Sequence, residues 1–265
     1  MGNKSVRMKR LFPKDAKMCI IPIDHSVTVG PVEGLQNSAR LIEELTDGGA
    51  DAIIFHKGLL TTLEKTRNFG MSRYIMHLSA STVYGEDANA KVLVSTVEEA
   101  VRSGMDAVSV HVSLGCTQEP AMLRDFGQVA CACEQWGMPL LAMVYVKEHS
   151  DVKALAHTAR LAQELGADIV KIGDPGSAEA IKNITDCVSI PVLIAGGEKN
   201  GDSQQLLYRV HNAITAGASG VAVGRNIFQH SNPQAMMRIV CDLVHQNKTL
   251  DEAVSALHSS GCANG

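Results

Sequence analysis

One lysine, Lys171, lies in the middle of the apolar run 168–174 (DIVKIGD), which leads into a Gly-Asp-Pro-Gly turn. A lysine is costly to bury as a cation, because desolvation penalises the charged form. A desolvated amine is therefore more often neutral, and a neutral amine can attack a carbonyl carbon to form a Schiff base. Two other roles stay open for Lys171: pairing with a buried carboxylate, or binding a substrate phosphate as a point charge. Lys57, which follows an earlier apolar run, is a second candidate that we expect to bind or pair rather than react.

Two further polar residues end apolar runs and could assist such an amine. The carboxylate of Asp24, beside His25, could hold substrate hydroxyls, orient Lys171 or shuttle protons. The phenol of Tyr145 could move the proton that accompanies carbon–carbon bond cleavage. The alternatives are an aspartate that caps the following loop and a tyrosine that belongs to the core.

Three histidines, His56, His77 and His111, also end apolar runs. They could indicate a metal enzyme, which is our second mechanism, but no carboxylate is spaced with them on one element. Each could equally be a hydrogen-bonded core residue. We therefore predict no metal and no cofactor.

Two glycine-containing loops have the composition of a phosphate site. Gly196-Gly197 and Gly224-Arg225 follow the last two apolar runs, and bare backbone there can approach a phosphate while the arginine adds a fork of donors. The alternative is a pair of tight turns that close a barrel.

These residues are positioned by a regular alternation of predicted strands and helices. We predict helices at 5–11, 35–47, 95–103, 119–136, 151–165 and 250–259, the third opened by a capping box from Ser95 to Glu98. The eight predicted strands are 19–25, 51–58, 74–81, 106–114, 139–146, 168–174, 191–197 and 220–228.

A repeated motif of the type Gly-Ala-Asp-Ala begins at Gly49, Gly104, Gly166 and Gly217, before every second predicted strand. Eight strands in four paired units predict an α/β fold of the (β/α)8 TIM-barrel type, with a short N-terminal helix and a single domain over 1–265. An open doubly wound sheet is the alternative, but its phosphate fingerprint after the first strand is missing.

The repeat also predicts which way each side chain points, because alternate residues of a strand face opposite sides. Large apolar residues occupy the positions that we assign to the helix-facing side: Ile53, Phe55, Val108, Val110, Val170, Ile172, Val221 and Val223. The other positions are smaller and more polar, and Lys171 is one of them. We therefore predict that Lys171 points into the barrel.

Composition limits the possible functions of these 265 residues. The chain is 45% hydrophobic but only 4% aromatic, which suits an α/β core. Its net charge of -4 argues against a nucleic-acid or anionic-membrane partner. There is no membrane-length apolar run and no secretory signal, and the seven cysteines are scattered and odd in number. We expect a cytoplasmic protein with reduced thiols.

The chain resembles the archaeal-type (DhnA-like) class I aldolase family, in particular its 2-amino-3,7-dideoxy-D-threo-hept-6-ulosonate synthases. The resemblance covers residues 5–257 and is carried by IPIDH (21–25), HKG (56–58), HLSAS (77–81), STVEEAVRSGMDAVSVHV (95–112), EQWGMPLLAM (134–143), ELGADIVK (164–171), AGG (195–197) and GVAVGRNIFQH (220–230).

This resemblance implies a (β/α)8 barrel that uses Lys171 for the Schiff base, Tyr145 as acid/base and Asp24 beside them, without a metal. It implies substrate and phosphate binding by the remaining matched positions: His25, Lys57, Ser79, His111, Gly196, Gly197, Gly224 and Arg225. The implied reaction joins a fragment of a phosphorylated ketose to an aldehyde, aspartate semialdehyde in the synthases, in aromatic amino acid biosynthesis. The implied assembly is a homo-oligomer of five or ten subunits.

Two loops depart from the family pattern. Residues 145–148 read YVKE instead of Tyr-Pro-Arg-Gly, and 172–177 read IGDPGS where the family commonly has Thr-x-Tyr-Thr-Gly-Asp. Three alternatives therefore stay open: a dihydroxyacetone-phosphate-dependent aldolase, an acyl-transferring relative that uses coenzyme A, and a non-catalytic sugar-phosphate-binding barrel.

Overall fold

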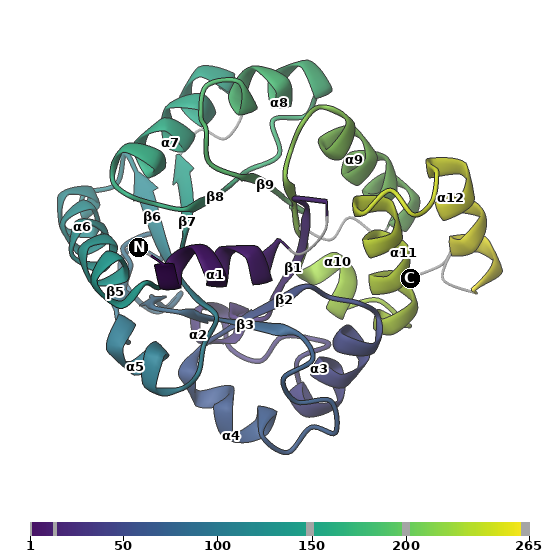
Figure 1. The fold of residues 1–265 in the computed structure, drawn as a ribbon, viewed down its shortest axis with the longest axis horizontal. Coiled ribbons are helices and arrows are strands. Elements are labelled where there is room, and N and C mark those ends of the chain that lie inside the picture. The colour runs from purple at the N-terminus through teal and green to yellow at the C-terminus, as the bar shows by residue number, and fades with distance from the viewer. Residues whose placement is uncertain (1, 13–14, 147–150, 198–201, 261–265) are drawn as a thin grey trace.

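The computed structural model describes residues 2–12, 15–146, 151–197 and 202–260. Within these ranges, eight parallel strands form a closed barrel in the order β1-β10-β9-β8-β7-β6-β3-β2 (Figure 1). The predicted (β/α)8 fold is therefore confirmed. The barrel strands are β1 (Met18–Pro22), β2 (Ala52–Phe55), β3 (Arg73–His77), β6 (Ala107–Leu114), β7 (Leu140–Val146), β8 (Ile169–Ile172), β9 (Val192–Ala195) and β10 (Gly220–Ala222).

Helices surround this barrel, as Figure 1 shows down its axis. Each buries an apolar stripe, and most begin at an Asn, Asp, Ser or Thr whose side chain accepts a backbone N–H. The outer helices are α3 (Ser38–Asp47), α4 (Leu60–Leu63), α5 (Val97–Arg102), α6 (Glu119–Trp136), α7 (Val152–Glu164), α8 (Ala178–Thr185), α9 (Ser203–Thr215), α11 (Pro233–Val244) and α12 (Leu250–Ser259). Short helices α2 (His25–Val29), η1 (Lys57–Leu59) and α10 (Arg225–Phe228) directly follow barrel strands.

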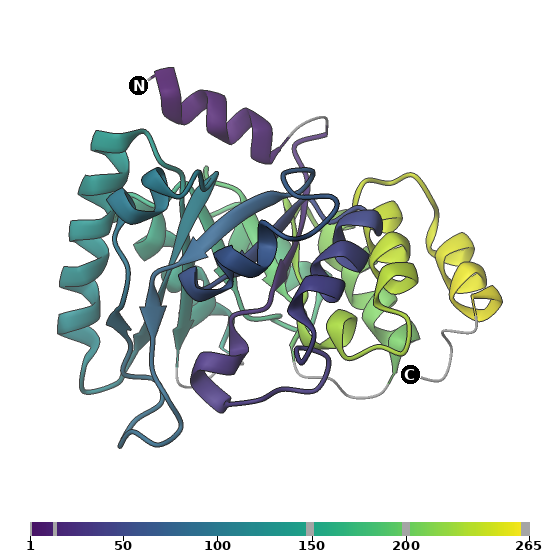
Figure 2. The ribbon, with the colours of Figure 1, turned by 90° about the horizontal axis from the view of Figure 1, so that it is seen from below.

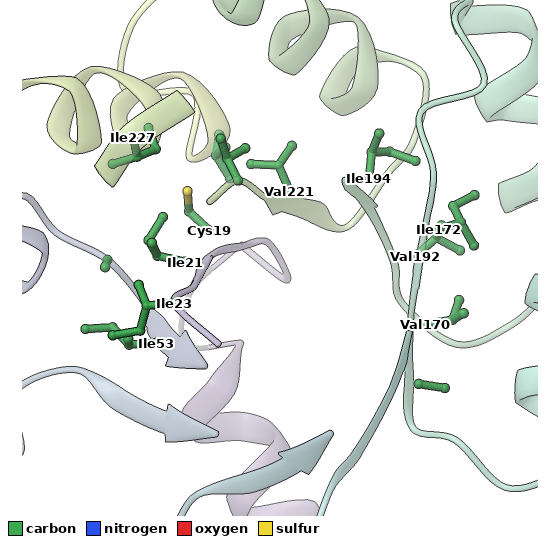
Figure 3. Close-up of a cluster of buried hydrophobic side chains, with 14 of the residues drawn as sticks. Cys19, Ile21, Ile23, Ile53, Val170, Ile172, Val192, Ile194, Val221 and Ile227 are labelled. Atoms are coloured by element: carbon green, nitrogen blue, oxygen red, sulfur yellow. The ribbon is translucent and has the colours of Figure 1, made fainter. Parts of the chain in front are cut away.

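The strands separate two apolar cores, and this confirms the predicted side-chain phase. The outer core lies between strands and helices, and Figure 3 shows Val170, Ile172 and Ile194 pointing outward from β8 and β9. The inner core fills the barrel with residues such as Ile54, Leu141, Ile169, Leu193 and Ala222. Lys171 alternates with Val170 and Ile172 on β8, so its side chain points into the barrel.

Helix α1 (Gly2–Leu11) covers one end of the barrel, and α2 lies at the other end (Figure 2). Leu11 is fully buried in the inner core. Lys4 holds the helix in place through Asp168 at 3.0 Å, and Arg7 donates to the carbonyls of Trp136 and Gly137 at 3.0 and 2.8 Å. The end that α1 covers is thus closed, and the opposite rim is left for a site.

The aspartates of the repeated motif have a structural role at the covered end. Asp51, Asp106 and Asp168 accept hydrogen bonds from the backbone N–H groups of Cys19, Tyr74 and Leu140, at 2.7, 3.0 and 2.8 Å. Each carboxylate therefore satisfies a donor at the start of a neighbouring strand. In the fourth repeat, the carbonyl of Ser219 accepts from Met18 instead.

Several predicted boundaries were wrong. The strand expected at 220–228 ends at Ala222, because Gly224 turns the chain and its carbonyl accepts from Ile227 and Phe228 in α10. The strand expected at 74–81 stops at 77, because the next residues form β4 (Ser79–Ala80), which pairs antiparallel with β5 (Val92–Leu93). The helix predicted at 95–103 is capped by Thr96, not Ser95: the Thr96 hydroxyl accepts from Glu99.

Candidate active site

Lys171 lies where two pockets meet at the open rim of the barrel. Its side chain is only 7% exposed. The first pocket, of about 490 Å³, contains Gly196, Gly197 and Gly224 and is called the glycine-loop pocket below. The second, of about 280 Å³, contains Asp24, His56, His77 and His111 and is called the histidine pocket. Four residues line both: Lys171, Tyr145, His25 and Arg225. A substrate attached to Lys171 would therefore have room on two sides.

Asp24 supplies a carboxylate that stays ionised beside this lysine. It follows β1 and precedes α2, and its oxygens lie 3.6 Å from His25 Nδ1 and 3.6 Å from His77 Nε2. Burial alone would raise the pKa of Asp24, but at the low pH where this carboxyl titrates it is attracted by the protonated imidazoles of His77 and His25, by Lys171 and by His56, which together lower its pKa to about 2. Asp24 can thus accept a proton or orient an amine at neutral pH.

The histidines around Asp24 are held in their neutral form. Desolvation lowers the pKa of His77 to about 4 and the pKa of His111 well below its usual value, and it also lowers the pKa values of His25 and His56. His77 Nδ1 lies 2.8 Å from the Ser109 hydroxyl. Neutral imidazoles can donate to or accept from substrate hydroxyls without adding charge.

Tyr145 is positioned by its neighbour on β6. Its ring stacks on His111 with centroids 4.9 Å apart, and His111 Nε2 lies 2.9 Å from the Ser113 hydroxyl. The predicted residue Ser79 joins this group, because its hydroxyl accepts from the backbone N–H of His111 at 3.0 Å. The phenol is thereby held between the two pockets, next to Lys171.

The two glycine loops meet at the other side of Lys171, as predicted. A Cβ at Gly224 would lie 2.9 Å from His25 Cε1 and 3.0 Å from the Pro22 carbonyl, so only glycine fits without rearrangement. The N–H of Gly196 donates to Ala222, so this glycine offers close approach rather than a free donor. Buried Asn226 joins the loops by donating to the Gly196 carbonyl at 3.1 Å.

Lys57 is the one predicted site residue that lies away from both pockets. It is in η1, pairs with Glu99 at 3.1 Å, and its side chain is 44% exposed. This ion pair agrees with the prediction that Lys57 binds or pairs rather than reacts.

Two basic residues line the site although the sequence reading did not select them. Lys91 precedes β5 and lines the histidine pocket, and its amine lies 2.6 Å from the Ser81 hydroxyl and 3.3 Å from the Thr28 hydroxyl. Desolvation lowers its pKa, against the attraction of Asp24. Arg209 on α9 lines the glycine-loop pocket. The sequence could have indicated Arg209, because it is a basic residue at the border of the apolar face of a helix.

Among the residues that the structure describes, no group of three His, Cys, Asp or Glu side chains is arranged to hold a metal ion. The six described cysteines form no disulfide. In the same ranges, no helix combines the length and apolar character needed to cross a membrane.

Residues 18–230 match the DeoC/LacD family of aldolases. The chain belongs to this family. It is 42% identical over 252 residues to 2-amino-4,5-dihydroxy-6-oxo-7-(phosphonooxy)heptanoate synthase of Streptomyces griseus, covering 93% of this aldolase and 92% of that relative. It is 38% identical over 259 residues to 2-amino-3,7-dideoxy-D-threo-hept-6-ulosonate synthase of Halobacterium salinarum, covering 96% of both chains.

Among solved structures, a Schiff-base-forming fructose-1,6-bisphosphate aldolase superposes on this aldolase with a TM-score of 0.81 and 28% identity. The match covers 91% of this chain and 99% of that one. The resemblance seen in the sequence is confirmed, and the chain is a Schiff-base (class I) aldolase.

The aldolase differs from the expected family pattern in two loops at the site. Gly173, Asp174 and Gly176, in the loop after β8, line the glycine-loop pocket, and Asp174 accepts from the Gly176 N–H at 2.9 Å. Of the loop after Tyr145, Lys147 and Glu148 lie outside the described residues.

Proposed function

We propose that Lys171 forms the Schiff base, that Tyr145 carries the proton at the reacting carbons and that Asp24 takes part in imine formation. The amine adds to a ketone, water leaves, and the imine draws electrons when the bond beside the former carbonyl breaks or forms. The observation that carries this proposal is the burial of Lys171 between two pockets, next to an ionised carboxylate and a stacked phenol.

The names of the two synthases support one acceptor for this aldolase. Both products are seven-carbon acids with a 2-amino group and a 6-ketone. An aldol bond lies one carbon away from the ketone, between C4 and C5. Breaking it leaves C1–C4 as aspartate semialdehyde in both cases. We propose this aldehyde as the acceptor.

The same reasoning gives two possible donor fragments. In the Streptomyces product, C5–C7 is dihydroxyacetone phosphate, whereas in the 7-deoxy product it is hydroxyacetone. We propose that a phosphorylated ketose provides the donor fragment and that the glycine-loop pocket binds its phosphate, through Gly197, Gly224 and Arg225. The histidine pocket then receives the aldehyde.

Borohydride reduction tests the central step. The protein is incubated with dihydroxyacetone phosphate or another ketose phosphate, reduced, digested and examined by mass spectrometry. We expect an adduct on the peptide that contains Lys171, no adduct in Lys171→Met and an unchanged adduct in the control Lys57→Met. The absence of a Lys171 adduct with every ketose phosphate would refute the proposal.

We also propose that the whole chain acts as one barrel unit and works in the cytoplasm as a homo-oligomer, as a ring of five or a pair of such rings. The family resemblance supports this assembly. Sedimentation velocity at micromolar concentration tests it, and a monomer across that range would contradict it.

A further inference from the structure

Arg209 is a charged side chain at the edge of the apolar face of α9. The helix buries Leu206, Val210 and Ala213 against the barrel, and Arg209 lies three residues after Leu206 and four before Ala213. It therefore belongs to the edge of the stripe that faces the strands. An arginine there needs a partner, because a guanidinium is costly to desolvate.

That partner is absent from the described part of the chain. Arg209 Nε and Nη2 are buried and have no hydrogen-bond partner there. Nη1 lies 3.3 Å from the position that a Cβ would take at Gly197. The guanidinium thus lies against the glycine loop that we assign to phosphate. An unpaired buried donor is destabilising, so a ligand that accepts a hydrogen bond from it recovers that free energy.

The charges of the glycine-loop pocket match a dianion. Among the described residues that line it, the ionisable side chains are Lys171, Arg209, Arg225, His25, Tyr145 and Asp174. The pKa of His25 is lowered by burial, and Lys171 is the residue that the proposed function attaches to the substrate. Within this described lining, two guanidinium groups face one carboxylate, Asp174, which already accepts from Gly176. A phosphate monoester, whose oxygens can each accept several hydrogen bonds, suits two such forks.

We propose that Arg209 is a second guanidinium ligand of the substrate phosphate and selects donors whose ketone fragment still carries that phosphate. This inference rests on the proposed function and deepens it. It favours a dihydroxyacetone-phosphate-type donor over a hydroxyacetone-type donor. The phosphate then lies on the same side of Lys171 as Arg209, Arg225 and Gly197.

The first experiment measures binding of inorganic phosphate by calorimetry at pH 8, where phosphate is a dianion. We expect Arg209→Met to weaken binding about tenfold or more, because a charge-assisted pair is lost. The phosphate affinity of Arg209→Lys should lie between those of wild type and Arg209→Met, since lysine keeps the charge but not the paired N–H donors of a guanidinium. Arg124→Met, at an exposed position on α6, is the matched control and should bind as the wild type does.

The second experiment compares kcat/KM for dihydroxyacetone phosphate and for dihydroxyacetone, each with aspartate semialdehyde. Arg209→Met should lower the phosphorylated value about tenfold or more and change the other less than about twofold. Equal losses on both donors, unchanged values, or a wild type that binds no phosphate would overturn the inference. If Arg209→Met does not fold, the same comparison of the two donors is made with Arg209→Lys, and a loss confined to the phosphorylated donor supports the inference.

The two proposals fail in different ways. A wild-type protein that shows no Lys171 adduct contradicts the proposed function, whereas the phosphate titration still decides the role of Arg209. An adduct that forms equally well in wild type and Arg209→Met, with equal phosphate affinity, contradicts only the inference.

Discussion

His245 holds together three segments at the covered end of the barrel, and its titration should appear in the stability of the protein. It caps the C-terminal end of α11, and its ring nitrogens lie 2.8 Å from Asp15 and 2.9 Å from Asp51. The hydrogen bond to Asp51, then the attraction of both carboxylates, raises the pKa of His245 to about 9 against the cost of burial. Asp51 also accepts from Cys19 at the start of β1, so the charge supports the barrel directly.

The magnitude follows from the difference between folded and unfolded pKa values. A rise from 6.5 to about 9 corresponds to at most about 3 kcal/mol. Because the ring is 20% exposed, we expect about 1–2 kcal/mol after solvent screening. A raised folded pKa means that this stability is fully present below pH 6.5 and is lost as the pH rises to about 9.

The assay is urea unfolding of wild type and His245→Gln at several pH values. We expect wild type to exceed His245→Gln in the free energy of unfolding by about 1–2 kcal/mol at pH 6. Near pH 9.5, where His245 is mostly uncharged, this difference should become smaller. The Lys171 adduct should form in both proteins, because His245 lies far from the open rim. A difference that is the same at pH 6 and pH 9.5 would refute the assigned charge of His245.

Four further outcomes are expected. Tyr145→Phe should lower kcat by about 10²–10⁴-fold while the borohydride adduct still forms, and an unchanged kcat would assign the proton to another group. Gly224→Ala should weaken inorganic phosphate binding, measured by calorimetry, because its Cβ would meet His25 at 2.9 Å; unaltered binding would show that the loop adjusts. Asp24→Asn should lower kcat by one factor throughout pH 5–8, because the pKa of Asp24 is about 2, and a factor that varies over this range would contradict that pKa. Leu11→Ala should cost about 2–4 kcal/mol in urea unfolding, and a cost near zero would show that α1 adds little.

The barrel and the direction of Lys171 could be predicted because both depend on a strand period of two. Val170 and Ile172 alternate with Lys171, and the repeated motif fixes the same phase on four strands. Asp24 and Tyr145 were predicted as polar residues that end apolar runs, and the family resemblance then implied their roles; both line pockets that Lys171 also lines. The alternation of residues along the strands was therefore sufficient to predict the barrel and the direction of Lys171.

The remainder depends on contacts that no local pattern contains. The end of the last strand was overestimated because α10 follows β10 closely and buries Ile227 and Phe228, which resemble the apolar residues of a strand. Lys91 was missed because β4 and β5 are only two residues each, too short to show a period. Arg209 was not predicted because it reaches the site from α9, whereas the predicted site residues lie on strands or follow their ends. Asp51 was treated as part of a repeat, although its partners Cys19 and His245 lie 32 and 194 residues away.

The N-terminal helix has a consequence for the order in which the chain assembles. The ribosome makes α1 before any of the barrel strands, yet the inner core to which Leu11 belongs contains side chains from all eight of them. Its docking surface is therefore incomplete until β10 has paired with β1. We therefore expect α1 to stay undocked until all eight strands have been made. Protection of its amides from hydrogen exchange would then report barrel closure itself.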